Sequence, residues 1–266
     1  MNPLVHVAVR AARRAGAIIV RYLERVENLR VEAKSRNDFV TEVDRHAERE
    51  IVAVIRKFYP QHAILGEEGG RSGGGESLWI IDPLDGTTNF LHGNPVFAVS
   101  IAYQHKGRLE AACIFDPLRQ EIFTAARGAG AFLDERRIRV SRQRTLDGAL
   151  IATGFPYRAN LQYADAYLAM LKRIMAAAAG VRRAGSAALD LAYVACGRFD
   201  GFWELGLQPW DTAAGTLLVQ EAGGLLGTLT GAPYRQGGNV IAAPPKLFKE
   251  LVQAIAPLVP AALRDA

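Results

Sequence analysis

Apolar and polar residues follow a helical period in the first part of the chain. Between residues 4 and 25 apolar side chains recur every three or four positions, which predicts an amphipathic helix. A second helical pattern follows Asp44 and stops before Pro60, because proline cannot continue a helix. Short apolar runs then predict strands, at residues 63–66, 78–81, 96–103, 109–115 and 121–125.

The pattern changes after about residue 145, where alanine-rich helical patterns alternate with short strand patterns. The helices are expected at residues 162–178, 186–196, 211–222 and 246–256, and the strands at residues 149–153, 181–184, 201–205, 224–228 and 239–243. This order predicts an α/β fold with two sheet layers interleaved with helix layers. We expect an N-terminal part, residues 1–145, and a C-terminal part, residues 146–266, in one compact unit.

Two polar segments are predicted to lie on the surface. Residues 71–76 read R-S-G-G-G-E and are expected to form a mobile loop. The densest basic segment runs from Arg136 to Arg144, with Ile138 and Val140 on one face, which is typical of the wet side of a strand. Binding of nucleic acid or a partner by this segment is the alternative.

Composition narrows the class of protein. Half of the 266 residues are hydrophobic and 22% are charged, which is typical of a globular protein with a sizeable core. The net charge of +5 bears on solubility rather than on fold. No run approaches the roughly 18 apolar residues of a membrane span, and arginines at 10, 13 and 14 interrupt the apolar start that a signal peptide needs. Cys113 and Cys196 lack metal-ligand spacing, so we expect buried, reduced thiols in a cytoplasmic protein.

Two aspartates close an apolar strand in the sequence W-I-I-D-P-L-D-G-T-T-N-F at residues 79–90. Asp82 and Asp85 can reach one or two cations from the strand end, with the carbonyl oxygen of Leu84 between them. Magnesium prefers such oxygen ligands and keeps water and substrate phosphate as the others. The spacing therefore favours a magnesium site.

The residues after Asp85 add a candidate anion site. The amides of Gly86, Thr87 and Thr88 are expected to begin a helix, and a helix start attracts anions. Without further residues, Asp82 and Asp85 could equally be turn and capping residues.

Other carboxylates occupy similar positions. Glu67 and Glu68 end a predicted strand, and two adjacent carboxylates repel each other unless one is paired. Asp211 begins another predicted helix and by itself is a good N-cap. Asp38 and Asp44 likewise look like loop and capping residues.

Together these motifs resemble the inositol monophosphatase family. The resemblance covers nearly the whole chain, and the wording looks most like the bacterial SuhB-type branch. The matching segments are G-E-E at 66–68, residues 79–90, W-D-T-A-A-G at 210–215, A-G-S-A-A at 184–188, the Lys34, Val40-Thr41 and Asp44 positions, and Glu204, seven residues before Asp211. The glycine-rich 71–75 loop departs from the family pattern, away from the chemistry.

The resemblance implies an α-β-α-β-α sandwich of the sugar phosphatase type and a magnesium-dependent phosphatase. Glu67, Asp82 and the Leu84 carbonyl would hold a first Mg²⁺. Asp82, Asp85 and Asp211 would hold a second, so most ligands lie in the N-terminal part. One acid–base pair supplies only about 10²–10⁴-fold acceleration, which is too little for a phosphate monoester, and metal ions can supply the rest.

The resemblance also assigns the remaining site residues. Glu67 and Thr87 would orient and deprotonate the attacking water, and the amides of residues 86–88 would take the phosphate oxygens. Hydroxyls of the leaving alcohol would contact Gly185, Ser186, Ala187 and Glu204, with Lys34 near a third metal and Asp44 as supporting residues.

The family suggests inositol-1-phosphate or a similar small polyol monophosphate as substrate, with lithium sensitivity and a homodimer. Histidinol phosphate, a 3′-phosphonucleotide and fructose 1,6-bisphosphate remain open on the same scaffold. So does a regulatory role with transcription antitermination proteins, with which SuhB-type relatives are associated. We expect no membrane association and no direct nucleic-acid binding, because no aromatic–basic stacking motif is present.

Three other chemistries are disfavoured by the residues. An aspartyl-phosphate route through Asp82 would resemble haloacid dehalogenase enzymes, whose two aspartates lie two residues apart rather than three. The five histidines form no H-x-x-x-H or H-E-x-x-H pattern, so zinc is not expected. Ser186 lies in G-S-A rather than in G-x-S-x-G, so a serine hydrolase is not expected.

Aromatic segments at residues 155–157 and 201–203 could support a dimer, although the second is almost equally typical of a core strand. A strand at residues 181–184 would aim Arg182 and Arg183 at opposite faces. One arginine would face the pocket or the core in a salt bridge, and the other would be free for a dimer or partner contact.

Overall fold

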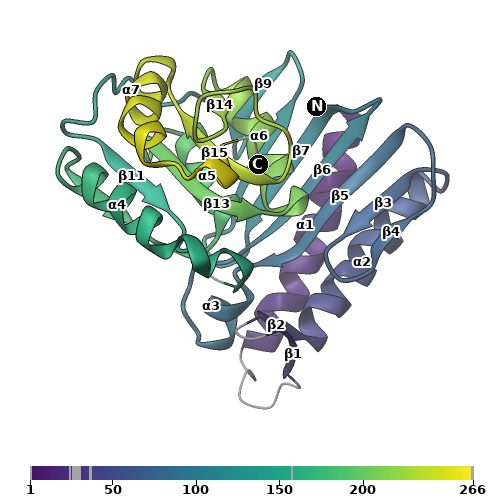
Figure 1. The fold of residues 1–266 in the computed structure, drawn as a ribbon. Helices are drawn as coiled ribbons and strands as arrows, with labels where there is room; N and C mark the ends of the chain where they lie inside the picture. Colours follow the sequence, from purple (N-terminus) through teal and green to yellow (C-terminus); the bar gives the residue numbers. More distant parts are fainter. Residues whose placement is uncertain (1, 24, 26–30, 36–37, 157, 265–266) are drawn as a thin grey trace.

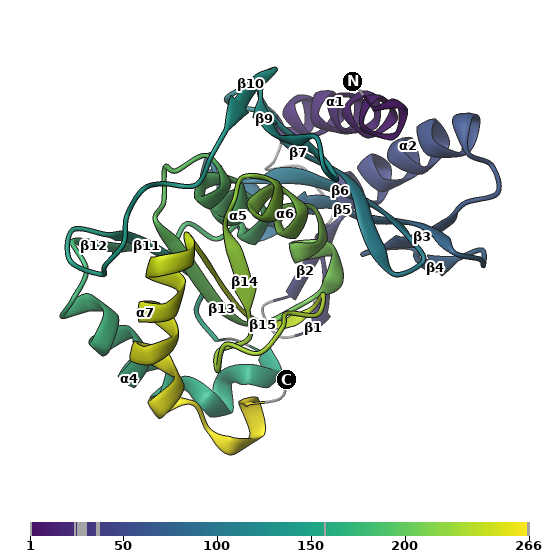
Figure 2. The same ribbon diagram turned by 90° about the horizontal axis from the view of Figure 1, so that it is seen from above.

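The protein is built in five layers (Figure 1). This computed structural model describes residues 2–23, 25, 31–35, 38–156 and 158–264. One pair of helices covers the outer face of a large sheet, a second pair lies between that sheet and a smaller one, and a third pair covers the smaller sheet (Figure 2). The predicted α/β fold, an α-β-α-β-α sandwich, is confirmed.

The large sheet has eight strands in the order β10-β9-β8-β7-β6-β5-β3-β4. The pair β3 and β5 is parallel, and the other neighbours are antiparallel. Helices α1 (Pro3–Leu23) and α2 (Glu42–Phe58) pack on its outer face. The strands are β3 (Ala63–Gly66), β4 (Gly70–Ser72), β5 (Ser77–Asp85), β6 (Ala98–His105), β7 (Arg108–Asp116), β8 (Glu121–Ala126), β9 (Gly130–Leu133) and β10 (Arg136–Ile138).

The smaller sheet has five strands in the order β12-β11-β13-β15-β14. Helices α5 (Ala187–Ala195) and α6 (Pro209–Glu221) pack between the two sheets, and α4 (Ala164–Met175) and α7 (Pro245–Ile255) cover the far face. The strands are β11 (Leu150–Thr153), β12 (Gly180–Arg182), β13 (Gly201–Leu207), β14 (Leu225–Gly227) and β15 (Gly238–Ala243). Shorter elements are β1 (Val31–Ser35), β2 (Asp38–Thr41), α3 (Thr87–Leu91), η2 (Arg158–Tyr163), η3 (Ala256–Leu258) and η4 (Ala261–Leu263).

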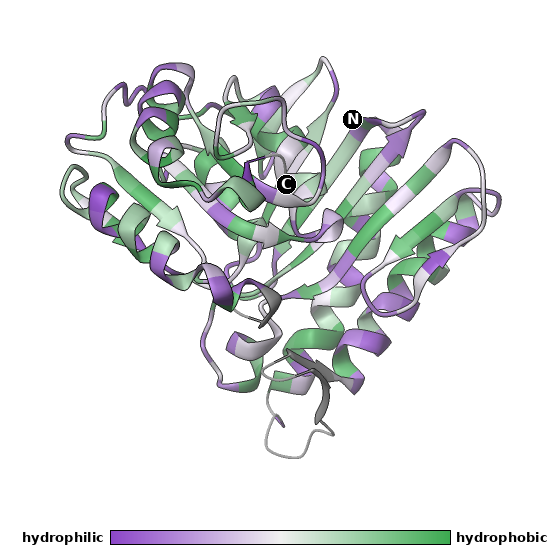
Figure 3. Ribbon diagram, in the orientation of Figure 1, coloured by the Kyte–Doolittle hydropathy of each residue, from purple (hydrophilic) through white to green (hydrophobic). Residues whose placement is uncertain are grey.

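The central helices are largely apolar, with little difference between their faces, as expected for helices buried between two sheets. Most residues of α5 and α6 are buried, whereas α2 and α4 show hydrophilic as well as hydrophobic residues (Figure 3). Among the described residues, none of the helices has the length and apolar character to cross a membrane. Both cysteines are free; Cys113 is buried and Cys196 half-buried.

Most expected elements are present, with shifted ends. Helix α2 begins at Glu42 rather than after Asp44, because Thr41 is the N-cap and Asp44 completes a capping box three residues later. Strand β5 continues past Ile81 to Asp85. The basic strand β10 is shorter than predicted, since it ends at Ile138, which is buried while the neighbouring arginines are exposed.

Three other predictions need correction. Residues 71–76 do not form a loop throughout, because β4 pairs with β3 up to Ser72. Strand β12 ends at Arg182, so Arg183 lies beyond the strand. Phe202 and Trp203 are fully buried in β13, which makes 201–203 a core strand rather than a dimer segment. In the other segment Phe155 is 48% exposed, and residue 157 lies outside the described residues.

Candidate active site

The end of β5 carries the first two predicted ligands. Between Asp82 and Asp85 the register with β6 shifts, so that two residues of β5 stand opposite one residue of β6. Pro83 lies in this bulge and has no amide hydrogen to donate to the ladder. Asp82 is 1% exposed, and its Oδ1 accepts a 3.0 Å hydrogen bond from the Leu84 amide. The bulge thus brings two carboxylates to the same end of one strand.

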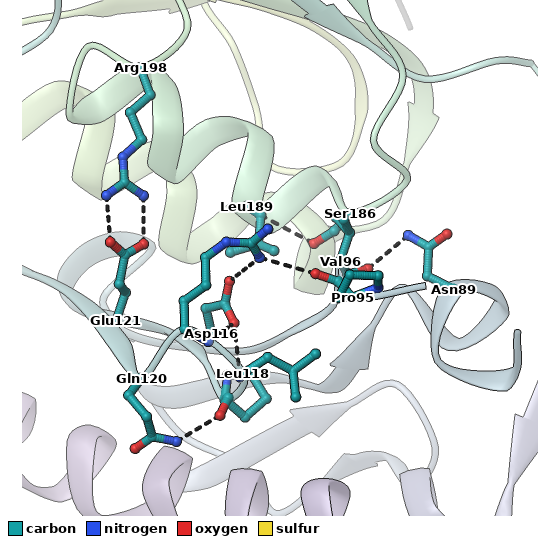
Figure 4. A network of polar contacts seen from close by, with 12 residues as sticks. Asn89, Pro95, Val96, Asp116, Leu118, Gln120, Glu121, Ser186, Leu189 and Arg198 are labelled. Carbon is teal, nitrogen blue, oxygen red and sulfur yellow. Dashed lines mark hydrogen bonds and ion pairs between the residues drawn. The ribbon is translucent and has the colours of Figure 1, made fainter. Parts of the chain in front are cut away.

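Asp85 is held by the start of α5. Its Oδ2 accepts hydrogen bonds from the Ser186 hydroxyl at 2.6 Å and from the Ala188 amide at 2.7 Å. Ser186 is also the N-cap of α5, since its hydroxyl oxygen accepts from the Leu189 amide (Figure 4). A carboxylate at a helix start is favoured by the helix dipole. The predicted substrate residue Ser186 therefore positions a predicted metal ligand.

The third aspartate comes from α6. Asp211 lies three residues after the N-cap Gln208 and accepts a 2.7 Å hydrogen bond from the Gln208 amide. Asp85 and Asp211 line one cavity of about 60 Å³. The other residues that line it are Gly154, Arg183, Gly185, Ala187, Glu204 and Leu207. The fold thus brings together residues that are far apart in the sequence.

Burial and mutual repulsion raise the pKa values of these carboxyls. Burial is the largest cause for each, and it raises the pKa of Asp85 to about 6 and those of Asp82 and Asp211 well above their usual range. The Glu67 carboxylate raises all three further, so Glu67 belongs to the same cluster. Within the described part of the chain, none of the three aspartates forms an ion pair with a basic side chain.

The chemistry of these donors fits a hard divalent cation. The carboxylates of Asp82, Asp85 and Asp211 form an all-oxygen set with the Leu84 carbonyl, and none of the three aspartates has a basic partner among the residues described. As the side chains stand, no group of three or more His, Cys, Asp or Glu in that part of the chain is close enough to surround one ion. The three aspartates accept hydrogen bonds from the protein instead.

Thr87 connects this cluster to α2. Its hydroxyl lies 2.9 Å from Oδ1 of Asp44 and 3.1 Å from the Leu84 carbonyl oxygen. Asp44 is 1% exposed, accepts two hydrogen bonds from Thr41, and has its pKa raised by burial. Gly86 precedes α3 with φ of 101°, and a Cβ there would lie 2.9 Å from the Val96 carbonyl oxygen. Thr87 and Thr88 then begin α3.

The sequence did not single out Glu48, which fixes the segment that carries Glu67. Its carboxylate accepts hydrogen bonds from the amides of Glu68 at 2.9 Å and Gly69 at 2.7 Å. A Cβ at Gly66 would lie 2.3 Å from Glu48 Oε2. The sequence does contain an indication of this role, because Glu48 lies on the buried face of α2 beside Ala47.

A second acidic pair lies beside the cavity. Glu204 is 7% exposed, and burial raises its pKa to about 8. Asp190, which the sequence analysis also passed over, is 1% exposed and its Oδ1 has no hydrogen-bond partner in the described structure. The Arg183 guanidinium, 5.5 Å above the Phe155 ring, opposes both pKa rises. The sequence does contain an indication of Asp190, because it is an aspartate within the apolar run of α5.

The rest of the substrate segment is shaped by Asn89. Its side-chain amide donates to the carbonyl oxygens of Val96 at 2.7 Å and Ala184 at 2.9 Å (Figure 4 shows the Val96 bond). Gly185 follows with φ of 92°, in the left-handed region. Lys34 lies in β1, but its side chain is outside the described residues.

Comparison with known proteins agrees with this architecture. The sequence profile described as "Inositol monophosphatase family" matches residues 1–259. The chain belongs to the inositol monophosphatase family. Members of this family generally use divalent metal ions, and the membership supports a phosphatase.

Proteins named SuhB and proteins named inositol monophosphatase are both similar to this chain. A Pseudomonas aeruginosa protein named "Nus factor SuhB" is 55% identical over 99% of the chain and 100% of its own length. The structure of the suppressor protein suhB from Bartonella henselae is 45% identical, with a TM-score of 0.92 over 96% of this chain and 98% of that one. An inositol monophosphatase structure from Anabaena is 37% identical, with a TM-score of 0.83 over 97% of each chain.

Proposed function

We propose that this protein is a Mg²⁺-dependent phosphomonoesterase of the cytoplasm that hydrolyses inositol-1-phosphate or a similar small polyol monophosphate. The carrying observation is the cluster of Asp82, which is buried, with Asp85 and Asp211, which are half-buried; none of the three has a basic partner in the described residues. Isolated buried carboxylates are unfavourable unless they are protonated or bound to a cation. A cation site is therefore the simplest reason to keep three of them together.

We assign the ligands as the family resemblance implies. Glu67, Asp82 and the Leu84 carbonyl oxygen would hold one Mg²⁺, and Asp82, Asp85 and Asp211 would hold another. When bound, such ions neutralise phosphate oxygens and lower the pKa of water. The amides of residues 86–88 would bind the phosphate oxygens.

Thr87 is suited to orient the attacking water. Its hydroxyl hydrogen is directed to Asp44 or to the Leu84 carbonyl, so the oxygen lone pairs face the remaining space. Such an oxygen accepts a hydrogen bond from water and fixes its position. The proton of the water would pass to Glu67, because a threonine hydroxyl is too weak a base to keep it. No covalent intermediate on Asp82 is needed.

Specificity would come from the wall of the cavity opposite the aspartates. Glu204, Gly185 and Ala187 line the same cavity as Asp85. Hydroxyl groups of a polyol can hydrogen-bond to a carboxyl in either protonation state. Histidinol phosphate, a 3′-phosphonucleotide and fructose 1,6-bisphosphate remain the alternative substrates.

The test is phosphate release from inositol-1-phosphate by the purified protein. Activity should be lost in EDTA and return with Mg²⁺, and lithium should inhibit it. Asp85→Asn removes one ligand charge without adding bulk and should abolish turnover. Full activity in EDTA, or in the Asp85→Asn variant, would refute the proposal.

A second candidate function rests on the 55% identical relative that is named a Nus factor. We propose that this chain also associates with transcription antitermination proteins, as a homodimer of the 28.9 kDa chain. Affinity capture from a bacterial lysate should recover transcription proteins with both wild type and Asp85→Asn, because association does not need turnover. Light scattering should give twice the chain mass. Capture of no transcription proteins would remove this candidate.

A further inference from the structure

A second cavity lies away from the acidic cluster, and many of its lining residues are basic or carry side-chain amides. Its volume is about 450 Å³, within the range of small-molecule sites. The turn between β6 and β7, the turn after β8, the last turns of α6 and residues 234–236 form its walls. Lys106, Arg108, Arg127 and Arg235 all line it.

The basic side chains outnumber their acidic partners. Lys106 lies 3.5 Å from Glu76, with both side chains 64% exposed. Glu110 contacts both Arg108, at 2.6 Å, and Arg127, at 3.9 Å. Two carboxylates therefore face four cations.

Arg235 supplies the free charge. No ion pair or hydrogen bond of its side chain occurs among the residues described here. Guanidinium groups match the geometry of phosphate oxygens and bind them with two parallel hydrogen bonds. The surplus charge thus favours an oxyanion.

Thr216 gives an independent indication of a ligand. It lines the cavity and is only 5% exposed, yet its hydroxyl lacks a hydrogen-bond partner in the described structure. A buried hydroxyl without a partner is unfavourable, and such atoms are uncommon. Side-chain amides of Gln104, Gln220 and Gln236 surround the same space. The cavity therefore offers hydrogen bonds to a polar ligand as well as charge.

This cavity is separate from the catalytic cluster. Thr216 and Gln220 lie on the same helix as Asp211, but toward its other end. With a rise of about 1.5 Å per residue, Thr216 is about 7.5 Å and Gln220 about 13.5 Å from Asp211 along the axis. The two cavities share no lining residue.

We infer that this basic cavity binds a phosphate-bearing small molecule of about mononucleotide size at a second, non-catalytic site. The phosphate contacts the arginines, with Arg235 as the free partner. The polar remainder of the ligand takes the Thr216 hydroxyl and the glutamine amides. The four basic side chains around the cavity disfavour an apolar ligand.

Titration calorimetry of the full chain in EDTA tests this site with AMP as the probe. EDTA keeps the acidic cluster free of cations, so that it repels phosphate. AMP should bind once per chain and more weakly as salt rises, whereas uncharged adenosine should not bind. Binding of citrate or of RNA without binding of AMP would overturn the inference, as would no binding of AMP.

Two substitutions test whether AMP binds in this cavity. Arg235→Gln should weaken binding about tenfold, because a charge-assisted hydrogen bond is lost. Thr216→Val should weaken it about two- to tenfold, with an unchanged or higher Tm, because the unpartnered hydroxyl is removed without changing shape. Arg144→Gln, an exposed arginine outside the cavity, is the matched control and should leave binding unchanged. AMP affinity unaltered by both cavity variants would overturn the assignment.

Discussion

The Ser186 hydroxyl donates a 2.6 Å hydrogen bond to Oδ2 of Asp85, across 101 residues of sequence. Asp85 ends a strand of the large sheet, whereas Ser186 caps a helix that lies between the two sheets. The same carboxylate oxygen also accepts the Ala188 amide. These two bonds oppose the rise in the Asp85 pKa that burial causes. One contact therefore joins the two halves of the fold and orients a proposed metal ligand.

Replacing Ser186 should remove both the cap of α5 and the hydrogen bond to Asp85. Ser186→Ala removes a helix cap and a bond to a carboxylate, so the free energy of unfolding should fall by about 1–2 kcal/mol. Urea denaturation measures this loss. Ser141→Ala is the control and should be milder, because among the described residues the Ser141 hydroxyl bonds only to the Gln143 amide. Equal stability of the Ser186→Ala variant and the wild type would contradict the capping role.

Thr87 should matter for turnover more than for substrate binding. Thr87→Val keeps the shape but loses the oxygen that would hold water, so kcat should fall about 10²-fold with little change in KM. Thr87→Ser keeps the hydroxyl and should retain most activity. Asp44→Asn should fall between the two, since it weakens the partner of the Thr87 hydroxyl. A Thr87→Val enzyme with normal kcat would exclude Thr87 from water positioning.

The layered fold could be predicted because apolar residues recur with helical or strand spacing in nearly every element. Short edge strands such as β4 could not, since Gly70 and Arg71 have little strand propensity and pair only through tertiary context. The site residues were predicted from motifs on strand ends and helix starts together with the family resemblance. Glu48 and Asp190 were missed because each is a single polar residue within an apolar helical stripe, and only packing reveals what it faces.

The metal-free protein should become less stable as pH rises. Burial raises the pKa of Asp85 to about 6 and that of Glu204 to about 8, above the values near 4 of the unfolded chain. Between those values the folded state binds more protons than the unfolded state, so the free energy of unfolding falls with rising pH. In EDTA, Tm should be higher near pH 5.5 than near pH 8.

Two comparisons test whether these carboxyls cause the fall in stability with rising pH. Asp85→Asn cannot ionise and should flatten the dependence on pH. Saturating Mg²⁺ should raise Tm most at the higher pH, because a cation there replaces the missing protons. A metal-free Tm that rises from pH 5.5 to pH 8 would show that these carboxyls do not govern stability.

Glu204 should select the leaving group. Its carboxyl packs directly over Gly154, where a Cβ would lie 2.0 Å from Glu204 Cδ, so its position is fixed by the absence of a side chain. Glu204→Gln keeps the shape and should raise KM for inositol-1-phosphate about tenfold. KM for an aryl phosphate, which has no ring hydroxyls, should change little.

Gly154→Ala tests the position of the Glu204 carboxyl instead of its chemical identity. The added methyl group must displace the Glu204 carboxyl, so KM for inositol-1-phosphate should again rise while the aryl phosphate is turned over normally. Burial and Asp190 raise the pKa of Glu204, so the carboxyl is largely protonated at neutral pH; glutamine is also uncharged, and the Glu204→Gln variant should stay folded. If both variants changed KM for the two substrates equally, Glu204 would act on the phosphate or the fold, and not on the polyol.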